Sequence, residues 1–187
     1  MENKKTENQV SSELEEFEKL IFYLSKRNSS IFIHNSDKDH AKCLILKMVE
    51  DAKKEIKLYT SGNDIIFYED SNITRHLQNK KLEITILFDD DGNKDKFNKI
   101  FSGARFYRLK RNIRSLQLSF SDTIKIDKEY KTIKHFMVVD KEMFRIEVPH
   151  DLEPKIVNAL GCFNNSEISE TLDNSFESIK TQYFQSC

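Results

Sequence analysis

The side chains best suited to chemistry are gathered in one short segment, residues 133–147. It holds a histidine at position 135, an arginine at 145 and a glutamate at 147, with the acidic run Asp140-Lys-Glu between them. The alternation of polar and apolar residues predicts two strands joined by a tight turn at Asp140. Such a hairpin brings His135, Arg145 and Glu147 close together, and this combination of imidazole, guanidinium and carboxylate is suited to binding a phosphate group.

The same residues also have a purely structural interpretation. A histidine on a strand among Ile, Met and Val side chains is more often a hydrogen-bonded core residue than a catalyst. Arg145 and Glu147 lie two positions apart on one strand and can form a simple ion pair, while Asp140 is a common turn former. Both interpretations stay open from the sequence.

A second candidate region is basic. Residues 105–114 contain five cations interleaved with Phe106 and Tyr107. Such a segment can contact phosphates and stack on bases, which predicts a nucleic-acid interface, and the alternative is a solvated strand end balanced by nearby acids. The cations are Arg105, Arg108, Lys110, Arg111 and Arg114.

Other motifs fail on their spacing. His40-Ala-Lys42 opens an amphipathic helix, where positions two apart point in different directions. Residues 89–95 resemble the start of a calcium loop, but the glycine is misplaced at 92 and Ile100 replaces the bidentate glutamate. We therefore interpret the segment as a solvated turn, with Mg²⁺ binding as the alternative, and we expect neither a metal site nor a cofactor.

Length and composition limit the architecture and the setting. The chain has 187 residues, of which 38% are hydrophobic, and a net charge of −1, so it can form a core but has no global attraction to nucleic acid. Cys43, Cys162 and Cys187 lack the close pairing of zinc or redox sites. With no signal peptide or long apolar run, we expect a cytoplasmic protein with no membrane contact. We expect a tail and helix over 1–28 and one domain over 29–187.

Helical and strand patterns alternate along the chain. Apolar spacing predicts helices over residues 12–26, 36–53 and 71–77, a short one around 97–101, and a final one beginning at 164. Capping residues at three of the starts are Ser12, Ser36 and Asn164. Apolar runs predict strands over 30–34, 55–59, 82–88, 104–109, 115–126 and 132–148. The order predicts an α/β fold with a mixed, mostly parallel sheet flanked by helices on both faces.

The hairpin and its neighbours resemble the phospholipase D superfamily. The family signature is His-x-Lys, four residues, Asp, then a Gly-Ser or related pair and an Asn. The run from His135 to Glu147 looks like a degenerate version of it. Ser102–Leu109 resembles the strand that precedes the signature, Gly161–Glu170 resembles the loop and helix that follow it, and residues 36–59 resemble the opening helix and strand. The resemblance implies a single half of a phospholipase D-like fold.

Counted back from Asp140, the resemblance places Ile133 at the nucleophilic histidine and His135 at the phosphate-binding lysine. Glu147 stands at the glycine of the following pair. Isoleucine cannot attack phosphorus, so the resemblance implies a cleft that binds its ligand without the family reaction. Because two half-sites meet in this family, a single half also implies a homodimer.

Three functions follow from the sequence. The preferred one is a non-catalytic binding or regulatory module that holds a phosphate-containing anion. Its predicted ligands are Lys134, His135, Arg145 and Asn164. The second is an active phosphodiesterase or nuclease with a rearranged site that uses His135, Asp140 and Glu147. The third is a nucleic-acid-binding regulator that uses residues 105–114.

Overall fold

The computed structural model describes residues 7–60, 65–88, 94–110, 118–119, 132–133, 135–147 and 157–186. These stretches contain six helices and ten strands. The helices are α1 (Glu7–Lys26), α2 (Lys38–Asp51), α3 (Ile65–Tyr68), α4 (Ser71–Asn79), α5 (Lys94–Ile100) and α6 (Ser166–Tyr183). The strands are β1 (Ile33–Asn35), β2 (Glu55–Thr60), β3 (Glu83–Phe88), β4 (Arg105–Leu109), β5 (Leu118–Ser119), β6 (Thr132–Ile133), β7 (His135–Val139), β8 (Met143–Glu147), β9 (Ala159–Cys162) and β10 (Phe184–Ser186).

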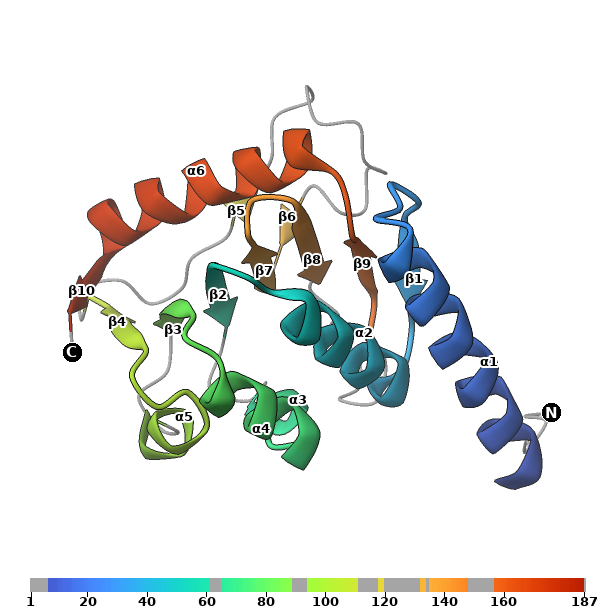
Figure 1. The fold of residues 1–187 in the computed structure, drawn as a ribbon. Helices are drawn as coiled ribbons and strands as arrows, with labels where there is room; N and C mark the ends of the chain where they lie inside the picture. Colours follow the sequence, from blue (N-terminus) through green and yellow to red (C-terminus); the bar gives the residue numbers. More distant parts are fainter. Residues whose placement is uncertain are drawn as a thin grey trace, which may run out of the picture.

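Eight of these strands form one mixed sheet in the order β1-β9-β8-β7-β2-β3-β4-β10 (Figure 1). Parallel pairing is confined to β2-β3 and β3-β4, and the other neighbours in this sheet are antiparallel. The predicted α/β class with a mixed sheet is confirmed, but the expectation that most of the sheet is parallel is wrong. The hairpin strand β7 joins β2 antiparallel, and the short strands β9 and β10 add three further antiparallel pairs.

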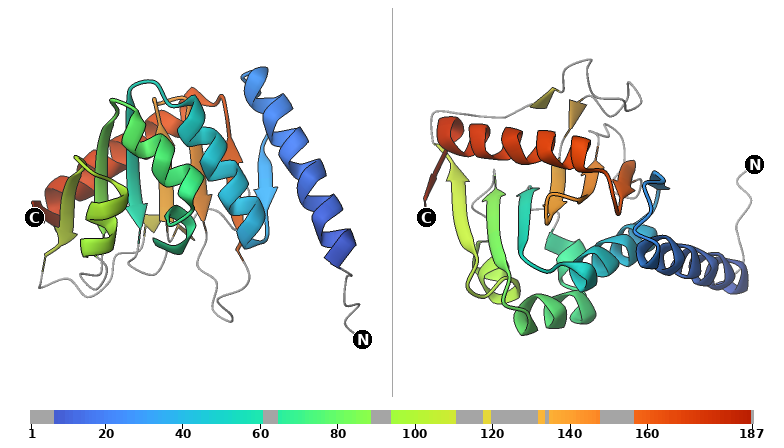
Figure 2. Two further views of the ribbon diagram at one scale, coloured as in Figure 1. Left: turned by 60° about the horizontal axis from the view of Figure 1, so that its bottom comes forward. Right: turned by 45° about the horizontal axis from the view of Figure 1, so that its top comes forward.

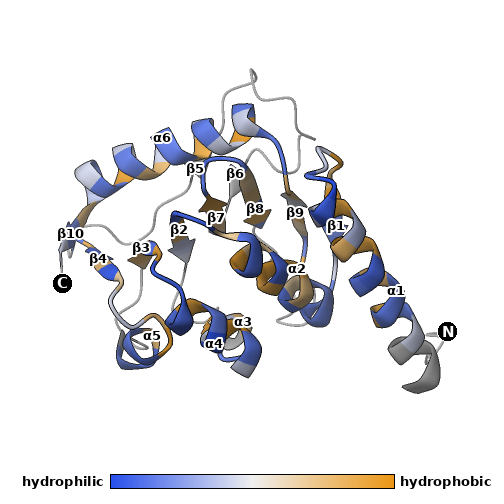
Figure 3. Ribbon diagram, in the orientation of Figure 1, coloured by the Kyte–Doolittle hydropathy of each residue, from blue (hydrophilic) through white to orange (hydrophobic). Residues whose placement is uncertain are grey.

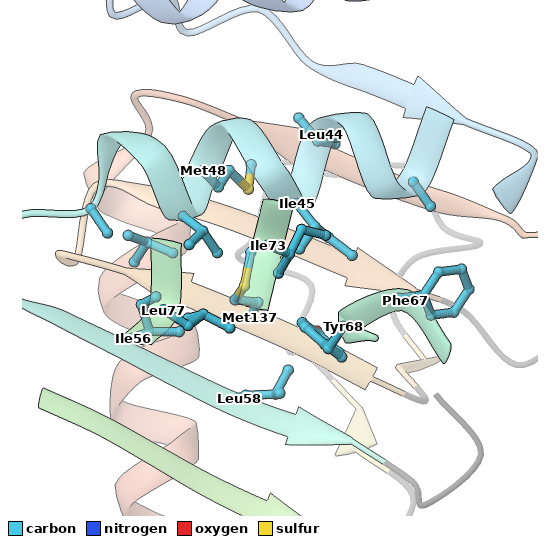
Figure 4. Packing of buried hydrophobic residues seen from close by; sticks show 14 of the residues in the cluster. Leu44, Ile45, Met48, Ile56, Leu58, Phe67, Tyr68, Ile73, Leu77 and Met137 are labelled. Atoms are coloured by element: carbon cyan, nitrogen blue, oxygen red, sulfur yellow. The ribbon is translucent and has the colours of Figure 1, made fainter. Parts of the chain in front are cut away.

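Helices cover both faces of the sheet, as predicted. Figure 2 shows α6 across one face and α2, α4 and α5 across the other, with α1 beyond the β1 edge. One apolar core lies between the sheet and α2, and includes Leu44, Met48, Leu58 and Met137 (Figure 4). The second core lies under α6. Since adjacent strand residues point to opposite faces, each core takes alternate residues of β2 and β7.

Gly161 lets α2 approach the sheet closely. A Cβ atom at this position would lie 2.7 Å from Leu44 Cδ2 and 3.3 Å from Met48 Cε. Gly161 faces Arg145 across β9 and β8. Its missing side chain therefore lets the α2 side chains reach the sheet beside Arg145.

The helix starts differ by a few residues from those predicted. Asp37 caps α2 in place of Ser36, because its carboxylate accepts hydrogen bonds from the backbone N–H groups of residues 39 and 40. Asn165 caps α6 in place of Asn164, through a hydrogen bond from the N–H of residue 168. Ser12 lies inside α1, which begins at residue 7. The capping composition was recognised, but neighbouring Ser, Asp and Asn residues compete for each cap.

The remaining differences between the predicted and the observed elements concern short helices and strands. The sequence analysis did not identify α3, β9 or β10, which have four, four and three residues. Such lengths are too short for a periodic pattern to stand out. Most of residues 115–126, predicted to be rich in strand, lies outside the described residues. Within the described ranges, no helix has both the length and the apolar character that a membrane span requires.

Candidate functional site

The β7–β8 hairpin forms as predicted and aligns its polar side chains. His135 faces Glu147 across the two strands, and Glu147 faces Ala159 of β9. Asn35 of edge strand β1 faces the same Ala159. Arg145 lies two residues from Glu147 and points to the same side of the sheet. We call Asn35, His135, Arg145 and Glu147 the Arg145 cluster.

Arg145 is the centre of this cluster. Its Nη2 donates to Glu147 Oε2 at 3.0 Å and is 3.4 Å from Asn35 Oδ1. The guanidinium carbon lies 5.8 Å from the centre of the Phe67 ring, so α3 covers the cluster with an aromatic side chain. The sequence analysis missed Asn35 because it lies 110 positions from Arg145 in the chain.

The cluster is buried, and part of its hydrogen-bonding capacity is unused. Exposed fractions are 4% for His135 and Arg145 and 2% for Asn35 and Glu147. Within the described part of the chain, Arg145 Nε and Asn35 Nδ2 have no hydrogen-bond partner. Burying a donor without an acceptor costs free energy, and most buried polar groups are satisfied. Two unsatisfied donors in one cluster therefore mark a place where an acceptor would be stabilised.

The cluster lies at the end of the sheet where open α/β sheets usually bind ligands. Tyr59 faces Phe136, so His135 lies beside the carboxyl end of β2. The parallel strands β2, β3 and β4 all end on this side of the sheet. Ligands of open α/β sheets bind outside the carboxyl ends of such strands. Lys134, a predicted ligand, lies outside the described residues.

Asp140 is not brought together with the Arg145 cluster, because it lies at the opposite end of β7. Its carboxylate accepts backbone hydrogen bonds from Lys53, Lys54 and Glu55 at 2.7–2.8 Å. Its own N–H donates to the carbonyl of Glu55. These bonds join the hairpin turn to the start of β2, so the contacts of Asp140 are structural.

Asn164 lies beyond the same distant end of the sheet. Asn164 follows β9, and the opposite end of β9 carries Ala159, which faces Glu147. The N–H of the next residue, Asn165, bonds to the carbonyl of Glu142 in the hairpin turn. The structure therefore does not bring Asn164 to His135 or Arg145.

A cavity of about 460 Å³ also lies at this distant end. It is formed by the ends of α1 and α2 and by the hairpin turn, including Asp140 and Glu142. Its Lys47 already contacts Glu50 and Asp51 at 3.3 and 2.9 Å. No member of the Arg145 cluster is among its lining residues, so this cavity is separate from the cluster.

A second ionic group lies on the other face of the sheet, under α6, with Lys57 and Asp173 buried and Glu177 and Lys141 about half exposed. Lys57 of β2 bonds to Asp173 and lies 3.0 Å from Glu177 Oε1. Lys141 is 3.3 Å from the other oxygen of Asp173, and Lys180 bonds to Glu177. We call these five residues the Lys57 network. Every acid in it has at least two cationic partners, as expected for a stabilising ion-pair network.

The basic region is only partly described. Arg105 Nη2 lies 3.4 Å from Glu83 Oε2, both exposed, and Lys110 Nζ donates to the carbonyl of Gln182 at 2.6 Å. Arg108 faces Gln185 of β10. Arg111 and Arg114 lie outside the described residues. The described cations therefore contact partners within the chain.

Among the described residues, the cysteines and acids do not assemble a reactive or metal-binding centre. Burial raises the pKa of Cys43 to about 12, with a further increase from Glu18 and Glu50. Burial also raises the pKa of Cys162. Such thiols are poor nucleophiles at neutral pH. In the part of the chain that is described, no three His, Cys, Asp or Glu side chains are grouped to hold a metal, and residues 89–93 lie outside it.

Comparison with known proteins identifies the fold. No protein-family model matches the sequence, and no curated protein matches it. Among solved structures, Nuc from Salmonella typhimurium, described as a phospholipase D family member, is similar with a TM-score of 0.55 at 14% identity, over 84% of this chain and 99% of that chain. NucT from Helicobacter pylori gives 0.52 at 10% identity, over 82% and 98%. The chain has a phospholipase D-like fold.

A third solved structure is also similar to this chain. TrmBL2, described as an archaeal chromatin protein with a novel mode of DNA binding, gives a TM-score of 0.52 at 11% identity, over 94% of this chain. This chain spans 63% of the length of TrmBL2. At 10–14% identity these likenesses concern the fold. The resemblance found in the sequence around His135 and Asp140 is thereby confirmed at the level of architecture.

Proposed function

We propose that this chain is a binding module of phospholipase D-like fold that holds a phosphate-containing anion on the Arg145 cluster. The main support is the pair of buried donors, Arg145 Nε and Asn35 Nδ2, which have no acceptor among the described residues. A phosphate oxygen accepts hydrogen bonds from guanidinium and amide groups and would satisfy both donors. The position beside the carboxyl end of β2 agrees with this role.

Glu147 limits which anions fit this site. Its carboxylate offsets the charge of Arg145, to which it bonds at 3.0 Å, so a bare anion gains less than it would beside an isolated arginine. A ligand that carries a hydroxyl next to its phosphate can donate to Glu147 while its phosphate accepts from Arg145. His135, directly opposite Glu147, adds an imidazole N–H donor to the cluster.

In this proposal the chain binds its anion and does not catalyse the phospholipase D reaction. The resemblance places Ile133 where that reaction needs a histidine, and the aliphatic side chain has no lone pair with which to attack phosphorus. Residue 133 belongs to β6, and the histidine at 135 begins β7. As the phospholipase D-like proteins combine two half-sites, the proposed module acts as a homodimer.

Isothermal titration calorimetry with inorganic phosphate and with dimethyl phosphate tests the binding proposal. We expect both anions to bind the wild type, and Asn35→Leu to weaken binding at least about tenfold, the effect of one lost charge-assisted hydrogen bond. Lys57→Met is the matched control, because it removes a buried cation from the opposite face. It should lower the melting temperature and leave phosphate affinity unchanged. Equal affinities for wild type and Asn35→Leu would reject the site.

An active phosphodiesterase remains the first alternative, and one observation favours it. His135 directly faces Glu147, the arrangement that a rearranged acid–base pair needs. Hydrolysis of bis(p-nitrophenyl) phosphate by the wild type, abolished in His135→Gln, would establish this activity. The binding proposal predicts no hydrolysis above background in either protein.

Nucleic-acid binding is the second alternative, favoured by the likeness to the DNA-binding protein TrmBL2. It would use Arg105, Arg108, Lys110, Arg111 and Arg114. Binding to duplex DNA that falls steeply with salt, and that is lost when Arg108 and Arg111 are both changed to Gln, would support it. The same change should leave the affinity for inorganic phosphate unchanged if the Arg145 cluster is the anion site.

A further inference from the structure

The exposed large apolar side chains of the described residues lie together in one short part of the chain. They are Leu20, Phe22, Tyr23 and Ile31, with exposed fractions of 48–59%. Three belong to the second half of α1 and the fourth follows the helix. Scattered exposed apolar residues need no explanation, whereas a contiguous exposed patch marks an interaction surface. Leu20 and Tyr23, three positions apart, share one side of α1, while the Phe22 ring lies under Lys26 and Lys47. Figure 3 shows apolar positions along this half of α1.

Helix α1 packs against the rest of the fold through one side only. Ile21 and Leu24 are buried, and with Phe17 they belong to the core under α2. Phe17 also stacks on His40 of α2, with ring centres 4.0 Å apart. Figure 2 shows α1 extending past the edge of the sheet, with α2 as its neighbour. The side that carries Leu20 and Tyr23 is therefore open.

The open side has an ordered distribution of charge. Residues spaced by three or four positions share one side of a helix, and one such series of exposed residues runs along α1. Its members are Glu13, Glu16, Leu20, Tyr23 and Arg27, and we call them the α1 stripe. It is acidic at its start, apolar in its middle and basic at its end. The guanidinium of Arg27 lies over the Tyr23 ring at 4.5 Å, which keeps the cation on the stripe.

This distribution is self-complementary in one orientation. When two copies of α1 cross antiparallel about Leu20, residue 27 of each copy faces residue 13 of the other, since both lie seven positions from the centre. Arg27 then meets Glu13, and the apolar middles meet each other. A parallel pair would instead bring Glu13 beside Glu13 and Arg27 beside Arg27, which is repulsive. A two-fold contact uses the same surface on both copies and requires this kind of self-complementarity.

We infer that α1 pairs with α1 of a second copy of this chain, antiparallel and through the α1 stripe. The inference does not rest on the proposed anion site, because no member of the Arg145 cluster belongs to the stripe. The dimer would carry two copies of the Arg145 cluster, one on the sheet of each chain. The α1 contact is separate from the contact between half-sites that the phospholipase D resemblance implies, because no member of the cluster belongs to α1.

Sedimentation equilibrium of the full chain and of charge-swapped variants tests the orientation directly. The wild type should dimerise at micromolar concentrations. Arg27→Glu and Glu13→Arg should each raise the dimer dissociation constant about tenfold or more, and the double variant should recover most of the wild-type affinity. Lys26→Glu is the matched control, because it changes charge in the same turn but off the stripe. It should leave dimerisation unchanged.

Leu20→Asp provides a second test at the centre of the proposed contact. It should give a monomer with an unchanged melting temperature in dilute solution, because the Leu20 side chain is half exposed. A wild-type monomer throughout the micromolar range would overturn the inference. A dimer that is insensitive to Leu20→Asp, or a double charge swap no better than the single ones, would overturn it as well.

Discussion

The two faces of the sheet hold two ionic groups that differ in how completely they are satisfied. In the Lys57 network, Lys57 has acidic partners in Asp173 and Glu177 and a third, Glu55, at 3.9 Å. Asp173 and Glu177 each have two cationic partners. In the Arg145 cluster, Arg145 has one acidic partner and an unsatisfied Nε, and Asn35 has an unsatisfied Nδ2 within the described part of the chain. A satisfied network stabilises the fold, and an unsatisfied one can serve a ligand.

The pKa shifts in the Lys57 network agree with a stabilising role. Burial alone would lower the pKa of Lys57, but hydrogen bonds to Asp173 and Glu177 raise it overall from its usual value of 10.5. Burial alone would raise the pKa of Glu177, but hydrogen bonds from Lys180 and Lys57 lower it overall from 4.5. In both residues the charged form is favoured in the folded chain. The Lys57 network is therefore satisfied within the chain, whereas the Arg145 cluster keeps two donors that an acceptor would satisfy.

We expect the largest change in the free energy of unfolding when the cation is removed from the Arg145 cluster. Arg145→Met removes the buried cation that bonds to Glu147 at 3.0 Å, and breaking a buried pair in this way costs about 3–5 kcal/mol. Urea unfolding should show this decrease in the free energy of unfolding. Arg145→Met combined with Glu147→Met should recover most of it, because both charges of the pair are then removed. A single variant as stable as the wild type would contradict the buried pair.

Removing the cation from the centre of the Lys57 network should lower the free energy of unfolding by a smaller amount. Lys57→Met leaves Asp173 with Lys141 and Glu177 with Lys180, so we expect a loss of about 2 kcal/mol. Urea unfolding of both variants under the same conditions compares the two faces. A larger loss for Lys57→Met than for Arg145→Met would contradict the expected order.

Asp140 should behave as a structural residue despite its place in the family signature. Asp140→Ala removes the acceptor of three backbone hydrogen bonds at the start of β2. Loss of a comparable carboxylate cap costs about 1–2 kcal/mol. We expect this loss in thermal unfolding with unchanged phosphate affinity. Weakened phosphate binding in a folded Asp140→Ala protein would instead link this turn to the ligand.

A substitution of Asn35 should change the free energy of unfolding much less than substitutions of Arg145, Lys57 and Asp140. The Asn35 amide makes one long contact to Arg145 and leaves Nδ2 unsatisfied. Asn35→Leu should therefore change the free energy of unfolding by less than about 1 kcal/mol, since one unfavourable buried donor is removed along with the contact. A loss of several kcal/mol would show that Asn35 serves the fold and would weaken the distinction between the two faces.

The smallest expected effect is a pH dependence of the Lys57 network. Because the pKa of Glu177 is lower in the folded chain than its usual 4.5, its contribution to stability is complete above pH 4.5. It is lost as the pH falls through the lowered pKa. The difference in melting temperature between wild type and Glu177→Gln should be constant above this range and shrink below it. A difference that grows on acidification would contradict the direction of the shift.

The sequence predicts the fold better than it predicts the site. The long helices, the strands of 55–60 and 83–88 and the hairpin at Asp140 follow from local periodicity, and the structure confirms them. The alternation rule also places Arg145 and Glu147 on one side of β8. Asn35, on a strand of three residues, joins them only through the pairing of β1 with β9. Long-range pairing of short strands leaves no local signal, so this residue could not be predicted.

A crystal structure grown in the presence of phosphate or tungstate tests the central claim most directly. The account predicts an anion within about 3 Å of both Arg145 Nε and Asn35 Nδ2, at the carboxyl end of β2. An anion bound only at the distant cavity beside Lys47 and Asp140, or an Arg145 cluster empty at saturating anion, would contradict it.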